Sequence, residues 1–239
     1  MDWQRSLFPI FAVDAAGRPG RFLGNACPID ENGGLLTCRH VIEGQERSEL
    51  GVYDFVEKQL RRVHNWLPDP ANHLDLVYMP NALPAPRQAF YPIMDPGAIW
   101  DGAELFTYGF YRVGEELQRG HFRGHLVSTG AIRKAGPQIL SLPFPVIEGI
   151  SGSAVITQHR GHKLIGVCFG SQSQRVRAYE IIDQLDGATQ YKETAWRVVE
   201  YGQAYHAAEL VAFADRLELT SLSVAKDRTT TPGLDDEGS

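Results

Sequence analysis

Cysteine is scarce in this chain, and long apolar runs are missing altogether. The 3 cysteines, Cys27, Cys38 and Cys168, are too few for a disulfide framework, and their odd number does not allow all of them to pair. No apolar stretch approaches the ~20 residues that a membrane-spanning helix needs, so we expect no membrane partner. Lys and Arg total 23 against 29 Asp and Glu, without a basic cluster. Affinity for phosphates comes from clustered cations, so we expect no nucleic-acid partner either.

What remains is the composition of an ordinary globular protein. Apolar residues make up 43% of the 239 residues and charged residues 22%, both near the average for soluble domains. The first apolar stretch is interrupted by Pro9 and Asp14 and lacks the pattern of a signal peptide. Together with the low cysteine content, this predicts a reducing compartment, and we expect a cytoplasmic protein.

Short apolar segments punctuated by glycine and proline indicate strands rather than helices. Strand signals cover residues 7–13, 21–29, 34–37, 75–79, 104–110, 124–128, 153–157, 163–169 and 196–205. Helix signals are a weak one at 179–185 and a stronger one at 207–217, where apolar residues recur at helical spacing. The pattern predicts an all-β barrel or sandwich followed by a C-terminal helix.

A proline-rich stretch divides the chain near its middle. Pro84, Pro86, Pro92 and Pro96 fall within residues 81–102, and such a segment connects elements rather than forming one. We therefore expect an N-terminal unit over residues 1–90 and a C-terminal unit over residues 91–220. The polar residues 221–239 are predicted to form a disordered tail.

Three short motifs carry residues suited to acyl transfer. His40 follows an apolar strand signal, Asp75 opens a buried one, and Ser151 lies in the glycine-flanked turn GISGSAV. A serine hydroxyl becomes a nucleophile when an imidazole takes its proton, and a carboxylate orients that imidazole. The N–H groups of Gly149 and Ser151 are predicted to stabilise the oxyanion that forms.

Two further carboxylates lie between the histidine and the serine. Asp69 falls between prolines in a predicted loop, and Asp54 lies near a polar hairpin. Asp75 is the one that opens a continuously apolar run, which favours it as the orienting carboxylate.

Histidine pairs elsewhere do not predict a metal site. His121 and His125, like His159 and His162, lie on expected strands or turns, where these spacings do not converge. No cysteine or carboxylate cluster completes either pair, so we expect no metal and no cofactor.

The three motifs resemble those of the trypsin-like, chymotrypsin-fold serine peptidases, in particular bacterial members that lack zymogen activation. The family motifs T-A-x-H and G-x-S-G-[GS]-P are similar to residues 37–40 and 149–154, with Ala154 in place of the proline. The resemblance spans roughly residues 5–218. It implies two six-stranded antiparallel β-barrels, a C-terminal helix, and a serine endopeptidase that acts on polypeptides through an acyl-enzyme.

The resemblance also implies how a substrate binds. One segment would pair with the substrate backbone, and others would form the walls, base and rim of the specificity pocket. Cys168, Phe169 and Gly170 would pair with the backbone. Gly170 and Gly202 would form the walls of the pocket, Pro145 and Val146 its base, and Glu148 its rim. The base lacks a carboxylate, so a Lys or Arg side chain would be buried without a partner, and we expect a preference for uncharged side chains of small to medium size.

Ile150 stands where zymogen-activated members carry an aspartate that pairs with a freed N-terminus. We therefore expect activity without processing, or a switch by an activating protein partner that the sequence does not identify. The competing hypothesis is a catalytically silent peptide-binding module of the same fold. The order His, Asp, Ser argues against it, because a binder needs none of the three.

Overall fold

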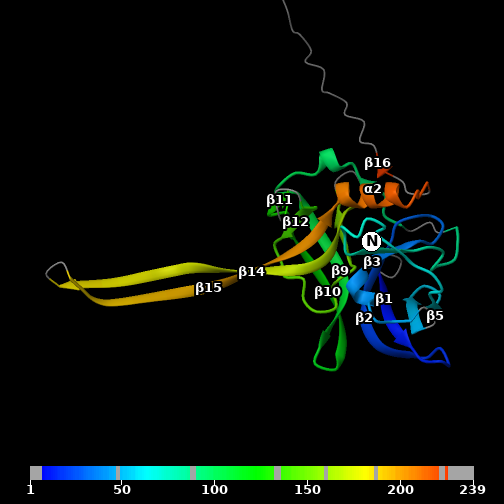
Figure 1. The fold of residues 1–239 in the computed structure, drawn as a ribbon, viewed down its shortest axis with the longest axis horizontal. Helices are drawn as coiled ribbons and strands as arrows, with labels where there is room; N and C mark the ends of the chain where they lie inside the picture. Colours follow the sequence, from blue (N-terminus) through cyan, green and yellow to red (C-terminus); the bar gives the residue numbers. More distant parts are fainter. Residues whose placement is uncertain are drawn as a thin grey trace, which may run out of the picture.

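The computed structural model describes residues 7–46, 49–86, 90–131, 136–158, 161–185, 188–220 and 224–225 (Figure 1). Its strands form two sheets. The first has the order β5-β4-β1-β2-β3-β7-β6. Its strands are β1 (Phe8–Val13), β2 (Pro19–Pro28), β3 (Leu35–Cys38), β4 (Leu50–Asp54), β5 (Gln59–Arg62), β6 (Leu67–Pro68) and β7 (Leu76–Met79). All of its neighbouring strands are antiparallel.

The second sheet follows in the chain and has the order β10-β9-β13-β14-β15-β12-β11. Its strands are β9 (Glu104–Val113), β10 (Glu116–His125), β11 (Ser128–Ala131), β12 (Gln138–Leu142), β13 (Ala154–Thr157), β14 (Lys163–Leu185) and β15 (Ala188–His206). Two short strands, β8 (Ile93–Met94) and β16 (Val224–Ala225), join beside β14 through parallel pairs. The helices are α1 (Arg39–Ile42), a 3₁₀ turn at Pro96–Ala98, and α2 (Ala207–Arg216).

The expected class, all-β with two antiparallel sheets and a C-terminal helix, is confirmed. The sheets hold 7 and 9 strands rather than six each, largely because they include β6, β8 and β16, which are strands of two residues. The division into units 1–90 and 91–220 stays a prediction. Of the expected tail 221–239, the structure describes β16, and the rest lies outside the described residues.

Two local predictions were wrong. Residues 179–185 are strand rather than helix, because β14 pairs with β15 from Tyr179 opposite Ala195 to Leu185 opposite Ala188. This long-range pairing overrides a short and weak helical signal. The strand expected at 124–128 is instead the end of β10 and the start of β11.

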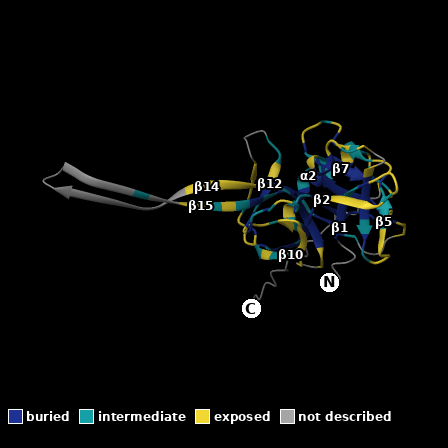
Figure 2. Cartoon of the chain, turned by 90° about the horizontal axis from the view of Figure 1, so that it is seen from below, coloured by how far each residue is buried: buried dark blue, intermediate teal, exposed yellow. Residues whose placement is uncertain are grey.

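The core lies between and within the two sheets, where the strands are most deeply buried (Figure 2). One apolar cluster joins both sheets and includes Phe8, Leu76 and Ile156, and α2 buries Leu210 and Phe213 against it. A second cluster lies within the second sheet. No helix in the described part of the chain is long and apolar enough to cross a membrane.

Candidate active site

His40 and Asp75 meet because β3 and β7 are antiparallel neighbours. Cys38, at the end of β3, lies opposite Leu76, at the start of β7, so the residues just beyond them share one end of the sheet. His40 Nδ1 is hydrogen-bonded to Asp75 Oδ2, and the His40 backbone N–H donates to Asp75 Oδ1 at 2.9 Å. An Nδ1–H donated to the carboxylate leaves Nε2 as the proton acceptor. The His40 side chain is 43% exposed, so this nitrogen is accessible to a substrate.

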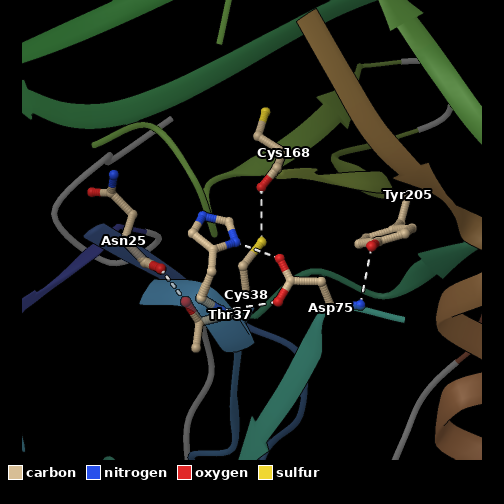
Figure 3. A network of polar contacts seen from close by, with 7 residues as sticks. Asn25, Thr37, Cys38, Asp75, Cys168 and Tyr205 are labelled. Atoms are coloured by element: carbon tan, nitrogen blue, oxygen red, sulfur yellow. Dashed lines mark hydrogen bonds and ion pairs between the residues drawn. The ribbon is translucent and has the colours of Figure 1, made fainter. Parts of the chain in front are cut away.

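Tyr205 supports the carboxylate residue from the second sheet. Its hydroxyl accepts a hydrogen bond from the Asp75 N–H at 3.0 Å (Figure 3). Its ring stacks on Phe169 with centroids 4.3 Å apart. Burial raises the pKa of Tyr205 to about 12, so the phenol stays protonated at neutral pH. Sequence reasoning assigned Tyr205 only to a closing strand and missed this role.

The other two aspartates are engaged elsewhere. Asp69 accepts a hydrogen bond from Arg216 at 2.7 Å. Burial raises the pKa of Asp69, but the hydrogen bonds from Arg216 and from neighbouring N–H groups lower it more, so it lies below its usual range. Asp54 accepts from the Val56 N–H at 3.0 Å. Of the three candidates, the structure brings Asp75 to His40.

The serine lies in a turn that requires two glycines. The Ile150 N–H donates to Ile147 O at 3.0 Å, and Gly149 between them has a φ of +98°, the pattern of a type II turn. Gly152 has a φ of +84°, and a Cβ there would lie 1.9 Å from Asn25 O. A side chain at Gly152 would therefore collide with the neighbouring strand.

This turn leaves two of its N–H groups unused. The N–H groups of Ile150 and Ser153 donate to carbonyls within the turn, and that of Gly152 donates to Cys168 O at 2.8 Å. Within the described part of the chain, the N–H groups of Gly149 and Ser151 donate to no protein acceptor. They are the two donors that the sequence analysis assigned to an oxyanion.

Asn25 ties the turn to the rest of the fold. Its backbone N–H donates to Ser151 O at 2.9 Å, and its Nδ2 donates to Gly149 O at 2.5 Å and to Phe110 O at 2.9 Å. Its Oδ1 accepts from the Phe110 N–H at 3.0 Å, and its carbonyl accepts from Thr37 Oγ1 at 2.6 Å (Figure 3). Sequence reasoning missed Asn25; an amide within an otherwise apolar strand was the available signal.

The histidine and serine segments pack together across Gly24. A Cβ on Gly24 would lie 2.8 Å from Val41 Cγ1 and 3.2 Å from Ser151 O. No hydrogen bond joins His40 and Ser151 among the described residues, and such bonds often tighten only when substrate binds. A cavity of about 170 Å³ opens beside them; its lining comprises Arg21, Phe22, Leu23, His40, Val41, Glu43, Arg112, Glu148 and Gly149.

The three cysteines are free and buried. Cys38 Sγ donates to Cys168 O at 3.1 Å (Figure 3). Burial, and then the charge of Asp75, raise the pKa of Cys38 well above its usual range, and burial raises that of Cys168 to about 12. Both thiols therefore stay protonated and are poor nucleophiles.

Cys38, His40 and Asp75 are also the one group of metal-binding side chains that lie together in the described residues, with ligand atoms within 4.8 Å of one another. A thiol with a raised pKa resists the deprotonation that metal binding requires. His40 and Asp75 already bond to each other, so this donor set does not favour a metal.

The expected pocket residues fall into two groups. A Cβ on Gly202 would lie 2.9 Å from Val146 Cγ2, so the structure brings these two expected residues together. Ser171, which was not expected there, accepts a hydrogen bond from the Val146 N–H on its Oγ at 2.7 Å. A Cβ on Gly170 would meet nothing within 4 Å, which leaves that wall open. Glu148 lies apart from them, on the cavity shared with His40. Pro145, next to Val146, is partly buried.

Comparison with solved structures places this fold among known proteases. The HtrA-type protease AlgW with a decapeptide aligns over 90% of this chain and 64% of its own length, at 17% identity and a TM-score of 0.58. A serine-to-alanine mutant of Rv3671c from M. tuberculosis H37Rv, in its inactive form, aligns over 91% of this chain and 88% of its own, at 14% identity and a TM-score of 0.55. This chain therefore spans less than two thirds of the AlgW structure.

No family model matches the sequence, and no curated protein matches it. The structural likeness nevertheless shows the fold: this chain has the architecture of chymotrypsin-fold, trypsin-like serine proteases.

Proposed function

We propose that this chain is a serine endopeptidase that hydrolyses peptide bonds through an acyl-enzyme. The single observation that carries the proposal is the pair of unused N–H groups, Gly149 and Ser151, in a turn packed beside the His40–Asp75 pair. Donors held toward one point stabilise charge that develops there, and losing one such donor typically costs ~10²–10³ in rate.

The proposed steps give each of these residues one role. Ser151 Oγ attacks the scissile carbonyl carbon while His40 Nε2 takes the hydroxyl proton, and Asp75 stabilises the imidazolium. The oxyanion accepts hydrogen bonds from the N–H groups of Gly149 and Ser151. The C–N bond then breaks as His40 returns the proton to the leaving amine. A water molecule deprotonated by His40 hydrolyses the remaining ester and releases Ser151.

Two features support this mechanism over its alternatives. The raised pKa values of Cys38 and Cys168 disfavour a thiolate nucleophile. A peptide-binding module without catalysis would need neither an oriented imidazole nor unused N–H groups beside it.

The proposal includes a polypeptide substrate and a cytoplasmic location. A polypeptide substrate fits the similar AlgW structures, which hold a tripeptide and a decapeptide. The free buried thiols fit a reducing, cytoplasmic compartment.

A fluorophosphonate probe tests the proposal, because it reacts covalently only with an activated serine. We expect labelling of the parent chain and none of Ser151→Ala or His40→Ala, each shown to be folded by circular dichroism. Triad members act as a unit, so each variant should lose a factor of ~10⁴ or more. Labelling of neither the parent nor the variants would favour the binding module or a state that needs an activating partner.

Activation without processing is part of the same proposal. Ile150 is fully buried in an apolar cluster, where it offers no charge to a new amino terminus. Mass spectrometry of the labelled species should therefore give the intact chain. A labelled product that always lacks its N-terminal residues would contradict this.

A further inference from the structure

β14 and β15 continue past the body of the protein as a two-stranded arm (Figure 1). The pairing of β14 with β13 ends at Val167, and that of β15 with β12 ends at Gly202. Farther out, β14 and β15 pair with each other and with no other described strand. At a rise of ~3.3 Å per residue, residues 171–185 extend about 50 Å. An isolated two-stranded hairpin is only marginally stable in water, so an arm of this length gains stability from additional strands.

A β-bulge divides the outer edge of β14, which is the edge that faces away from β15. The register of the β14–β15 pair shifts between Arg177 and Tyr179, which leaves Ala178 as an extra residue. On either side of it lie an inner segment, residues 171–177, and an outer segment of the same length, residues 179–185. A bulge bends its strand, so an added strand fits best if it bends at the same place. A second copy of β14 that runs antiparallel meets this condition, because its own bulge then lies opposite the first.

The two segments of β14 carry opposite charges. The inner segment has Arg175 and Arg177 and no acidic residue. The outer segment has Glu180 and Asp183 and no Lys or Arg. β15 shows no such division, since its basic and acidic residues alternate along the arm. The β14 strand is therefore basic near the body and acidic toward the far end of the arm.

This division of charge favours one partner, a second copy of the same strand. Antiparallel pairing of two β14 strands sets the inner segment of each copy beside the outer segment of the other, so that opposite charges meet at both ends. Parallel pairing would set like charges together, which is destabilising. Two copies related by a two-fold axis meet through the same surface on each, and an edge that is complementary to itself provides such a surface.

Other features of the arm agree with the pairing of strands. Residues 171–185 contain neither proline nor lysine, two residues that proteins place on edge strands to prevent association. Residues 171–175, where the edge leaves the body, are exposed. Residues 171–201 carry 4 Lys and Arg against 5 Asp and Glu. This balance suits neither nucleic acid nor an anionic lipid surface, both of which require clustered cations.

We propose that two copies of this chain dimerise through the outer edges of β14 and form one four-stranded antiparallel sheet from their two arms. The two bulges lie together at the centre, and each outer segment covers the inner segment of the partner. The two bodies then lie at opposite ends of the shared sheet, separated by about the length of one arm, so they do not collide. Residues 168–170, which the sequence analysis assigned to the substrate backbone, lie closer to the body and outside this interface.

Charge reversal tests this arrangement. Arg175→Glu together with Arg177→Glu makes both segments acidic, and Glu180→Arg together with Asp183→Arg makes both segments basic. Sedimentation velocity of the full chain over a range of concentrations gives the dissociation constant of the dimer. We expect the parent to dimerise and each double variant to raise this constant at least about a hundredfold, since like charges then face each other at both ends. An equal mixture of the two double variants should form a dimer with a constant within about tenfold of the parent, because each segment again faces its opposite.

Lys192→Glu together with Arg197→Glu is the matched control, because it changes the net charge as much as the acidic double variant does, but on β15. Its dissociation constant should stay within about threefold of the parent, since exposed charges that are not in contact interact weakly.

A shortened arm provides a second test. Residues 175–198 are replaced by Asn-Gly, which joins the register partners Gln174 and Val199 through a two-residue turn. This variant should be a monomer, with circular dichroism confirming that the body is folded. Should the shortened variant fail to fold, the charge variants decide alone.

Several outcomes would overturn the proposal. A monomeric parent would assign the arm to a partner of another sequence. A double variant that dimerises like the parent, a mixture that stays monomeric, or a folded shortened chain that stays dimeric would exclude the β14 edge as the interface. Loss of the dimer in the β15 control would do the same. The dimer does not depend on catalysis, so failure of the endopeptidase function is read separately, from fluorophosphonate labelling of the parent.

Discussion

Replacing Asn25 by alanine should slow acylation far more than it weakens substrate binding. The Asn25 side chain makes 3 hydrogen bonds, to Gly149 O, Phe110 O and the Phe110 N–H, and is fully buried. The bond to Gly149 O fixes the peptide plane beside the unused Gly149 N–H. Without it this donor is free to turn away, and the loss approaches that of a missing oxyanion donor, ~10²–10³ in kcat.

The same substitution also lowers stability, and the two effects must be separated. Burying polar groups without partners costs about 1–3 kcal/mol each. Some relaxation and water entry will recover part of this, so we expect the free energy of unfolding to fall by ~2–4 kcal/mol. Tyr78→Phe is the matched control, because it removes a buried hydrogen bond of 2.7 Å to Asp30, which is not part of the serine turn.

The assay combines urea unfolding with steady-state kinetics on a short peptide ester, under conditions where each variant is folded. Asn25→Ala should lose kcat with little change in KM, whereas Tyr78→Phe should lose stability and keep kcat. If Asn25→Ala kept kcat within about threefold while its stability fell as expected, the turn itself would be holding Gly149, and the reasoning would be refuted.

Further predictions concern the turn, a helix cap and the pocket. Gly152→Ala should destabilise the fold by about 4 kcal/mol or more, measured by urea unfolding, because its Cβ would lie 1.9 Å from Asn25 O. Burial lowers the pKa of His206, the N-cap of α2, below 6.5. The contribution of the neutral His206 side chain to the free energy of unfolding should therefore be fully present above pH 6.5 and decline as the pH falls below it. His206→Asn, which keeps a capping acceptor, should flatten that decline. A peptide-library digest should give cleavage after uncharged side chains of small to medium size, since Val146 and Gly202 offer no carboxylate, with ~1–3 kcal/mol of discrimination. Dominant cleavage after Lys or Arg would contradict this.

Much of this protein could be derived from local sequence. Short apolar segments bounded by glycine and proline predicted most strands, because each such segment buries one face or both in a sheet. The helical spacing at 207–217 predicted α2, which spans Ala207–Arg216. The glycines of the GISGSAV turn, Gly149 and Gly152, both adopt positive φ, which glycine alone accepts without strain. Asp75 could be preferred over the other aspartates because it opens a buried run.

What the sequence could not supply depends on contacts between distant residues. The arm of β14 and β15 arises from pairing across a hairpin of more than thirty residues, so residues 179–185, with a weak local preference for helix, are held as strand. Asn25 and Tyr205 gain their roles only when the two sheets pack, which brings Asn25 to Gly149 and Tyr205 to Asp75 across the contact between the sheets. A local pattern records which face of a strand is buried; only the assembled sheets decide which buried groups meet.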